Sequence, residues 1–236
     1  MLGTIINTAA VIICAVIGTL FKGGIPDRFN DTIMKALGLA VLLIGLSQAF
    51  EVRHMLLLIF SMVFGSIIGE LLDIDKNLEK LGLWIERKVG AGEGTFAKGF
   101  VTASLIFCIG SMAIVGSLQS GLTGNHEMLK AKSVLDGFAS IILASTMGIG
   151  VAFSGVAIFL YQGAITLGAT FLKDFLNEEI IREVSAVGGL LISAIGLNFF
   201  DIKRIKVANM LPALFIPFIY FIVFVPFLDF INRNFF

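Results

Sequence analysis

The sequence predicts an all-α fold, a polytopic helical membrane bundle of about eight transmembrane helices with interrupted helices. Of its 236 residues, 57% are hydrophobic, 23 are Phe and only 14% are charged, whereas soluble domains carry about 25% charged residues. The mean hydropathy is +0.98. A soluble fold of this length could not bury so much apolar surface. Residues 1–236 are therefore predicted to form one integral membrane domain, with the lipid bilayer as a partner.

Three mostly apolar runs open the chain. A helix needs about 20 such residues to cross the hydrocarbon core, and residues 2–21, 33–50 and 54–72 meet this requirement. No basic residue precedes the first run, and no cleavage-site pattern follows it. We therefore expect this run to be a retained helix and not a signal peptide.

The middle of the chain holds a fourth run, residues 99–124, and a longer one, residues 137–172, with no charge in its 36 residues. A single helix of that length would measure about 54 Å, too long for one crossing. Two helices broken near Gly148 and Gly150 fit better. The first of them must then begin before Gly137, which draws Asp136 and Lys132 toward the membrane.

The remaining segments are two last spans, residues 184–200 and 207–228, and one long polar stretch, residues 73–98. The polar stretch has apolar residues at helical spacing and the only tryptophan, Trp84. It is predicted to form an amphipathic helix at the cytoplasmic interface, either as a packed connector or as a membrane-sensing element.

The distribution of basic residues sets the expected orientation. With both termini outside, eleven of the 17 Lys and Arg residues lie on the cytoplasmic side, as the positive-inside rule requires. A seven-span topology gives the same split, so only the length argument favours eight spans. We expect a multi-pass protein of the bacterial inner membrane.

Several functional classes are disfavoured by composition. Basic and acidic residues cancel at 17 each, which removes the signature of nucleic-acid binding. Cys14 and Cys108 lie inside apolar runs and are predicted to be buried packing residues. Both histidines are at span ends, no hydrolase or zinc-protease motif is present, and Glu70 is the nearest candidate for a carboxylate dyad with Asp136. We expect no enzyme activity, no cofactor and no metal.

A weak internal repeat links the second and seventh spans. Gly38-Leu39 and Ile44-Gly45-Leu46 reappear as Gly189-Leu190 and Ile195-Gly196-Leu197, at a constant offset of 151. The repeat halves would be residues 1–72 and 153–228, around central helices at 99–152. Equivalent spans five apart face opposite ways, and inverted repeats are typical of secondary transporters. A chance match in a Gly/Leu/Ile-rich alphabet is the alternative.

Two segments carry signs of interruption. Residues 108–125 alternate glycines with serines and Gln119, which indicates either a helix broken within the membrane or close helix packing. Pro212 and Pro217 remove backbone donors and should kink the last span.

The strongest candidate site lies before Gly137. Lys132 and Asp136 are four residues apart and share a helix face with Ser133 nearby. A carboxylate in the membrane normally faces a cavity or the bundle interior. The pair is either a coupling or substrate site or a neutralised pair that fixes the start of the helix. Further polar residues could line the same midplane site: Asn7, Ser111, Gln119, Gln162 and Asn198.

Several motifs resemble a known family. They are the segments GSMAIVGS at residues 110–117, LKAKSVLDG at 129–137 and ASTMGIGV at 144–151, together with the opening LGTIIN. The sequence resembles the YdfK/YqgA-type family of bacterial membrane proteins, classed as domain of unknown function 554, over essentially the whole chain. The resemblance implies a multi-span inner-membrane protein and brings no established substrate.

These features predict a secondary transporter of a small polar solute or ion. A channel, or a structural or assembly membrane protein without a substrate, is the alternative. The sequence is compatible with a homo-oligomer. It does not identify the substrate or the coupling ion.

Overall fold

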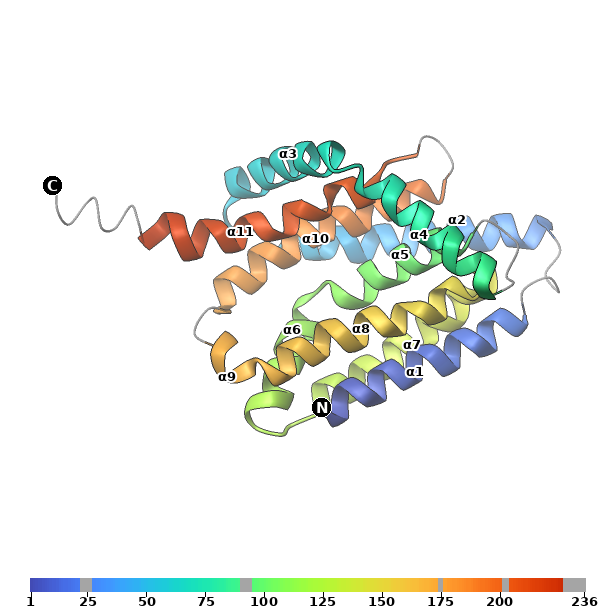
Figure 1. The fold of residues 1–236 in the computed structure, drawn as a ribbon, viewed down its shortest axis with the longest axis horizontal. Coiled ribbons are helices and arrows are strands. Elements are labelled where there is room, and N and C mark those ends of the chain that lie inside the picture. Colours follow the sequence, from blue (N-terminus) through green and yellow to red (C-terminus); the bar gives the residue numbers. More distant parts are fainter. Residues whose placement is uncertain (22–26, 90–94, 174–175, 201–203, 227–236) are drawn as a thin grey trace, which may run out of the picture.

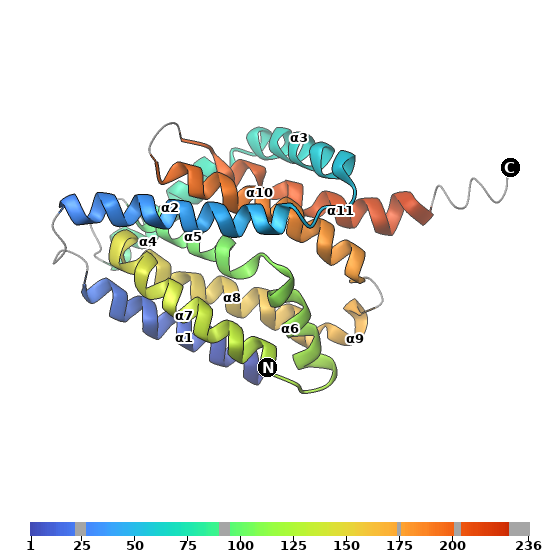
Figure 2. The same cartoon turned by 180° about the vertical axis from the view of Figure 1, so that it is seen from behind.

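The computed structural model of the protein is a helical bundle, seen from two sides in Figures 1 and 2. Every element within the described part of the chain is a helix and none is a strand, which confirms the predicted fold class. The structure describes residues 1–21, 27–89, 95–173, 176–200 and 204–226.

The first four helices follow the sequence closely. They are α1 (Leu2–Leu20), α2 (Asp27–Ala49), α3 (Met55–Leu71) and the amphipathic α4 (Ile74–Val89). Helix α4 packs against the start of α5 (Phe96–Cys108) and against η1 (Val207–Phe215), and runs obliquely across the ends of its neighbours (Figure 1). An exposed Trp84 on this helix fits the predicted place at an interface.

The fourth predicted span is interrupted. Helix α5 (Phe96–Cys108) and helix α6 (Ser111–Leu122) meet at a bend of 61°. Between them Gly110 has φ +127° and ψ 148°, a conformation essentially restricted to glycine. The α-helix therefore cannot continue through this residue, and the broken-helix interpretation of residues 108–125 holds.

The long uncharged run is divided in two, as predicted. Helix α7 (Glu127–Met147) ends at Gly148, which has φ +78°, and α8 (Gly150–Leu167) follows, with the short α9 (Ala169–Leu172) after it. Because α7 begins ten residues before Gly137, Lys132 and Asp136 both lie on it.

The last part of the chain departs from regular α-helix. Helix α10 (Glu178–Asn198) is regular, but η1 (Val207–Phe215) is a 3₁₀-helix, α11 (Ile216–Ile219) is a single turn, and η2 (Tyr220–Phe224) is a π-helix. Pro212 and Pro217 lie in this segment, and each lacks the N–H that an α-helical ladder needs. The end of the predicted span, residues 227–228, lies outside the described residues.

Four described helices are long and apolar enough to cross a membrane, and the number rises to six if each of two bent pairs is one span. Helix α7 has sufficient length but carries several charges, and residues 207–223 form a shorter apolar segment. The count of eight therefore stays a prediction. Large apolar side chains such as Leu20, Phe50 and Leu71 are exposed on the outside of the bundle, as contact with lipid requires.

The helices form two groups (Figures 1 and 2). Helices α1, α7, α8 and the α5–α6 pair lie on one side, and α2, α3, α10 and η1 lie on the other. The closest packing joins α1 to α7, α2 to α10, and α3 to η1. Buried Phe107, Leu191 and Ile192 contribute to the shared core between the groups.

Glycines bring the backbones of α2 and α10 together. A Cβ on Gly45 would lie 2.6 Å from the Gly189 carbonyl oxygen, and a Cβ on Gly189 would lie 2.5 Å from that of Gly45. Gly38 and Gly196 meet in the same reciprocal way. Such contacts are typical of helix packing through small residues in membranes.

Candidate functional site

A buried polar cluster joins α1 and α7. Lys132 Nζ donates to Asp136 Oδ1 at 2.9 Å, and Asn7 Nδ2 donates to Asp136 Oδ2 at 3.1 Å. The side chains of Lys132 and Asp136 are each only 8% exposed, and Asn7 is fully buried. Both carboxylate oxygens are therefore occupied, and the formal charges of the pair cancel.

Small residues allow α1 and α7 to approach closely enough for this contact. A Cβ on Gly18 would overlap the Ile141 backbone, and Gly137 lies against Cys14. Gly3 meets Leu129 in the same way. These contacts advance along both helices in the same direction, so the two helices are parallel. Asn7 on α1 thereby reaches the carboxylate of Asp136.

The broken helix lies next to this cluster. Cys108, the last residue of α5, is close enough to Lys132 and Asp136 to interact with them electrostatically. Tyr161 on α8 is in turn near Cys108. The cluster therefore lies between α1 and α7, near the end of α5.

The predicted serines contribute differently. Ser133 Oγ donates to the Leu129 carbonyl oxygen at 2.6 Å, which is a bond within its own helix. Ser111 is the first residue of α6, but the position of its side chain is outside what the structure describes. Ser133 therefore adds no described contact to the ion pair.

The predicted glutamines lie on the same side of the molecule. Gln162 on α8 is fully buried, and neither of its amide atoms has a hydrogen-bond partner among the described residues. Gln119 on α6 is half-buried. Asn7 Oδ1 and Thr8 Oγ1 on α1 also lack described partners. Buried polar atoms are normally hydrogen-bonded, but unpartnered ones also occur on other described helices, such as Ser61 on α3 and Ser185 on α10.

Asn198 is placed elsewhere. Its Nδ2 donates to the Ile205 carbonyl oxygen at 2.9 Å, and its Oδ1 accepts from the Ile205 N–H at 2.7 Å. It thus fixes the connection between α10 and η1 at one end of the bundle. The structure does not bring it to the Asp136 cluster.

Glu183 is a buried carboxylate that the sequence did not single out. It is 1% exposed on α10, and its Oε1 accepts from the backbone N–H groups of Arg53 and His54 at 2.9 and 3.0 Å. These groups precede α3, so a carboxylate there satisfies donors at the start of that helix. The signal available in the sequence was the position of Glu183 directly before the uncharged run at residues 184–200.

Glu70 lies in a different ion pair. Its carboxylate accepts from Lys206 Nζ at 2.6 Å and from Asn209 Nδ2 at 2.5 Å. The Glu70 carboxylate raises the pKa of Lys206, which lies outside the membrane segments. No His, Cys, Asp and Glu group that could hold a metal occurs among the described residues.

The fold and the buried polar cluster define this chain as a polytopic α-helical membrane protein with an ion pair inside its bundle. The family described as "Protein of unknown function (DUF554)" matches residues 2–222, and the chain belongs to that family.

Two relatives cover nearly the same length. The chain is 36% identical to the "Uncharacterized membrane protein YdfK" of Bacillus subtilis (strain 168) and 29% identical to the "Uncharacterized protein YqgA" of Escherichia coli (strain K12). Each alignment spans 221 residues, which is 92% of this chain and 94% of the relative. No solved structure matches the chain.

Proposed function

We propose that the protein is a secondary transporter of a small polar solute or ion, and that Lys132, Asp136 and Asn7 form its coupling or substrate site. The observation that carries the proposal is the ion pair at 2.9 Å with both side chains 8% exposed. Ionised groups within a membrane domain are costly and commonly mark a transport pathway. Residues of the broken α5–α6 helix lie beside it, as in transporters with discontinuous helices.

The chemistry of the pair provides a route to coupling. Asp136 accepts from both Lys132 and Asn7. Protonation of Asp136 removes the charge that Lys132 neutralises and leaves a buried ammonium group without its counter-ion. Binding of an acidic solute group would restore neutrality, because a buried charge is stable only when it is paired. Proton binding and solute binding would then favour each other.

The helix pairing supports an inverted repeat. At the offset of 151, Gly38 corresponds to Gly189 and Gly45 corresponds to Gly196. The observed contacts join Gly38 to Gly196 and Gly45 to Gly189, which is the exchange that a two-fold axis would produce. The equivalent helices α1 and α8, and α3 and η1, also pack on each other. This arrangement favours two inverted halves around the central helices.

We further propose the bacterial inner membrane as the location, with both termini outside and no enzymatic activity. A structural or assembly protein is the second candidate, because Lys132 and Asp136 satisfy each other's charge without any ligand. A channel would need a continuous hydrated path past the same pair. Ligand binding that depends on Asp136 separates the transporter from the structural protein.

The first experiment is a thermal-stability panel on the purified protein in detergent. The probes are Na⁺, K⁺, pH steps, inorganic phosphate, short carboxylates and amino acids, applied to the wild type and to Asp136→Asn. A ligand at 100 times its Kd stabilises the folded state by about 2.7 kcal/mol. Glu127→Gln is the matched control, because Glu127 is an exposed carboxylate on the same helix.

We expect a probe that stabilises the wild type and Glu127→Gln but not Asp136→Asn, with each variant compared with its own ligand-free midpoint. The same probe should then accumulate in proteoliposomes of the wild type under an imposed pH gradient. Uptake by Asp136→Asn at the wild-type rate would exclude Asp136 as the coupling group.

A further inference from the structure

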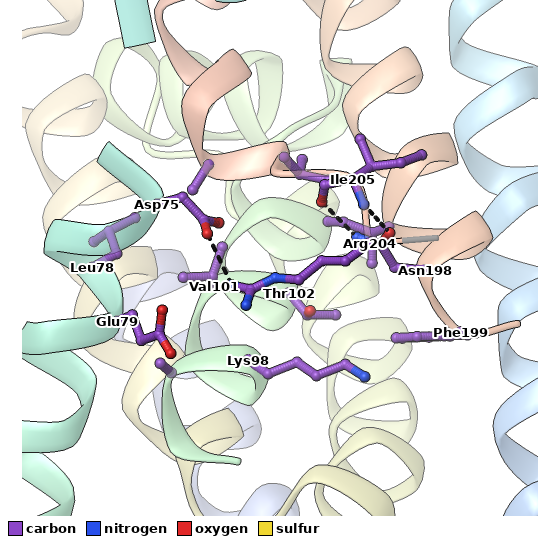
Figure 3. A pocket seen from close by; sticks show the side chains of 14 residues that line it. Asp75, Leu78, Glu79, Lys98, Val101, Thr102, Asn198, Phe199, Arg204 and Ile205 are labelled. Carbon is purple, nitrogen blue, oxygen red and sulfur yellow. Dashed lines mark hydrogen bonds and ion pairs between the residues drawn. The ribbon is translucent and has the colours of Figure 1, made fainter. Parts of the chain in front are cut away.

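A second polar region lies at one end of the bundle. A cavity of about 420 Å³ opens between α4, α5, the end of α10 and residues 204–208 (Figure 3). This volume falls in the range of small-molecule sites. None of the Asn7, Lys132 and Asp136 cluster borders it. It is therefore separate from the site of the proposed transport function.

Hydrogen bonds and an ion pair connect the segments that form one wall of this cavity. Arg204 donates from its guanidinium to Asp75 Oδ2 at 2.8 Å. The Asp75 N–H donates to Asn209 Oδ1 at 2.6 Å, and Asn198 holds the Ile205 backbone through two bonds. The start of α4 and the connection between α10 and η1 are thereby fixed relative to each other.

Two opposite charges border the cavity without pairing. Lys98 on α5 and Glu79 on α4 are labelled on different walls in Figure 3. Lys98 Nζ lies 5.9 Å from the centre of the Phe199 ring, and it makes no ion pair within the described ranges. Glu79 likewise has no ion-pair partner there. The buried Thr102 hydroxyl adds a neutral donor and acceptor to the lining.

We propose that this cavity binds a small zwitterion, with its acid group at Lys98 and its ammonium group at Glu79. A simple anion would complement Lys98 but approach the Glu79 carboxylate, and a simple cation would meet the reverse conflict. A molecule with one charge of each sign satisfies both walls at once. A free amino acid and the phosphoethanolamine headgroup of a lipid share this chemistry.

The test uses the full-length protein in nanodiscs made of phosphatidylglycerol alone. The probes are the twenty standard amino acids and O-phosphoethanolamine, each measured by thermal shift and then by calorimetry. We expect at least one probe to bind, and Lys98→Gln and Glu79→Gln each to weaken its Kd at least about tenfold. Lys76→Gln is the matched control, because Lys76 is exposed on α4 and does not border the cavity.

Two further variants keep the result independent of folding. The charge-reversed double variant Lys98→Glu/Glu79→Lys should bind the probe more tightly than either single reversal, since it again offers one charge of each sign. Asp136→Asn should retain the wild-type Kd. Loss of binding in Asp136→Asn together with full binding in Lys98→Gln would place the probe at the other cluster and overturn the proposal.

The lipid composition distinguishes the two sources. If the headgroup is the occupant, nanodiscs containing phosphatidylethanolamine stabilise the wild type but not Lys98→Gln, and they abolish the binding of added O-phosphoethanolamine. If the occupant is a free amino acid, its Kd is the same in both lipids. The proposal is wrong if no probe binds in either lipid, or if acetate or inorganic phosphate binds as tightly as the zwitterions.

Discussion

The Lys132–Asp136 pair shows how single residues act in this fold. Two charges four residues apart on α7 stay in the bundle because each neutralises the other at 2.9 Å. Taking charges out of water is costly, and removing one partner leaves the other uncompensated. The stability of the protein should therefore depend on the pair and not on either charge alone.

Lys132→Met is expected to lower the stability by about 3–5 kcal/mol, because it leaves the Asp136 carboxylate buried and unpaired. The double variant Lys132→Met/Asp136→Leu should be more stable than Lys132→Met. Thermal or denaturant unfolding in detergent measures both effects. If the loss of stability in the double variant equals the sum of the losses in Lys132→Met and Asp136→Leu, the pair does not act as a unit.

Helix α10 carries a buried carboxylate, Glu183, and an exposed one, Glu179, whose contributions to stability can be compared. Glu183→Ala should lower the stability by about 1–3 kcal/mol, because the N–H groups of Arg53 and His54 lose their acceptor. Glu179→Ala removes only an exposed contact to the His54 ring, for which about 0–1 kcal/mol is expected. Equal losses in the two unfolding experiments would argue against the buried acceptor.

At the scale of elements, the α2–α10 pair depends on backbone contact. A Cβ on Gly45 would overlap the Ser193 backbone nitrogen, so the helices would have to separate. Gly45→Ala should therefore lower the melting temperature. Gly163→Ala is the control, because its Cβ would meet only the end of Met1 at 3.5 Å and alanine is the better helix former. Gly163→Ala should leave the melting temperature unchanged or raise it.

The break between α5 and α6 depends on one backbone conformation. Gly110 has φ +127°, and an L-residue there is strained by about 1–3 kcal/mol. Gly110→Ala should lower the free energy of unfolding by the same amount, which the shift of the unfolding midpoint measures. Gly124 also has a positive φ, +67°, and a Cβ there would meet only open space. Gly124→Ala therefore tests backbone strain alone, at a residue outside the break. A Gly110→Ala protein with wild-type stability would mean that the break tolerates a side chain.

For the whole molecule, the number of spans decides which side each connection faces. The starts of α7 and α10 lie at the same end of the bundle, opposite the start of α4 (Figure 1). In an otherwise cysteine-free protein, Asn125→Cys and Glu178→Cys should react with an impermeant maleimide in intact cells. Lys76→Cys should react only after permeabilisation. Labelling at Asn125→Cys without labelling at Glu178→Cys would instead support seven spans.

Much of the fold could be predicted because its causes are local. Glycine at Gly110 and Gly148 ends helices through backbone conformation, and the prolines near residues 212–217 end regular α-helix through missing donors. The site was predicted only in part. Lys132 and Asp136 share a face by helical spacing, but the meeting of Asn7 with Asp136 joins residues 129 apart.

Hydropathy, backbone restriction and helical period act over a few residues, so the membrane class, the places where helices break and the pair on α7 follow from the amino acids alone. The folded chain was needed to show that Asn7 completes the cluster and that Asn198 lies apart from it. It also placed Glu183 at the start of α3 and set Lys98 and Glu79 around one cavity. These contacts depend on helix directions and close glycine packing, which involve segments far apart in the chain, so local sequence patterns could not predict them.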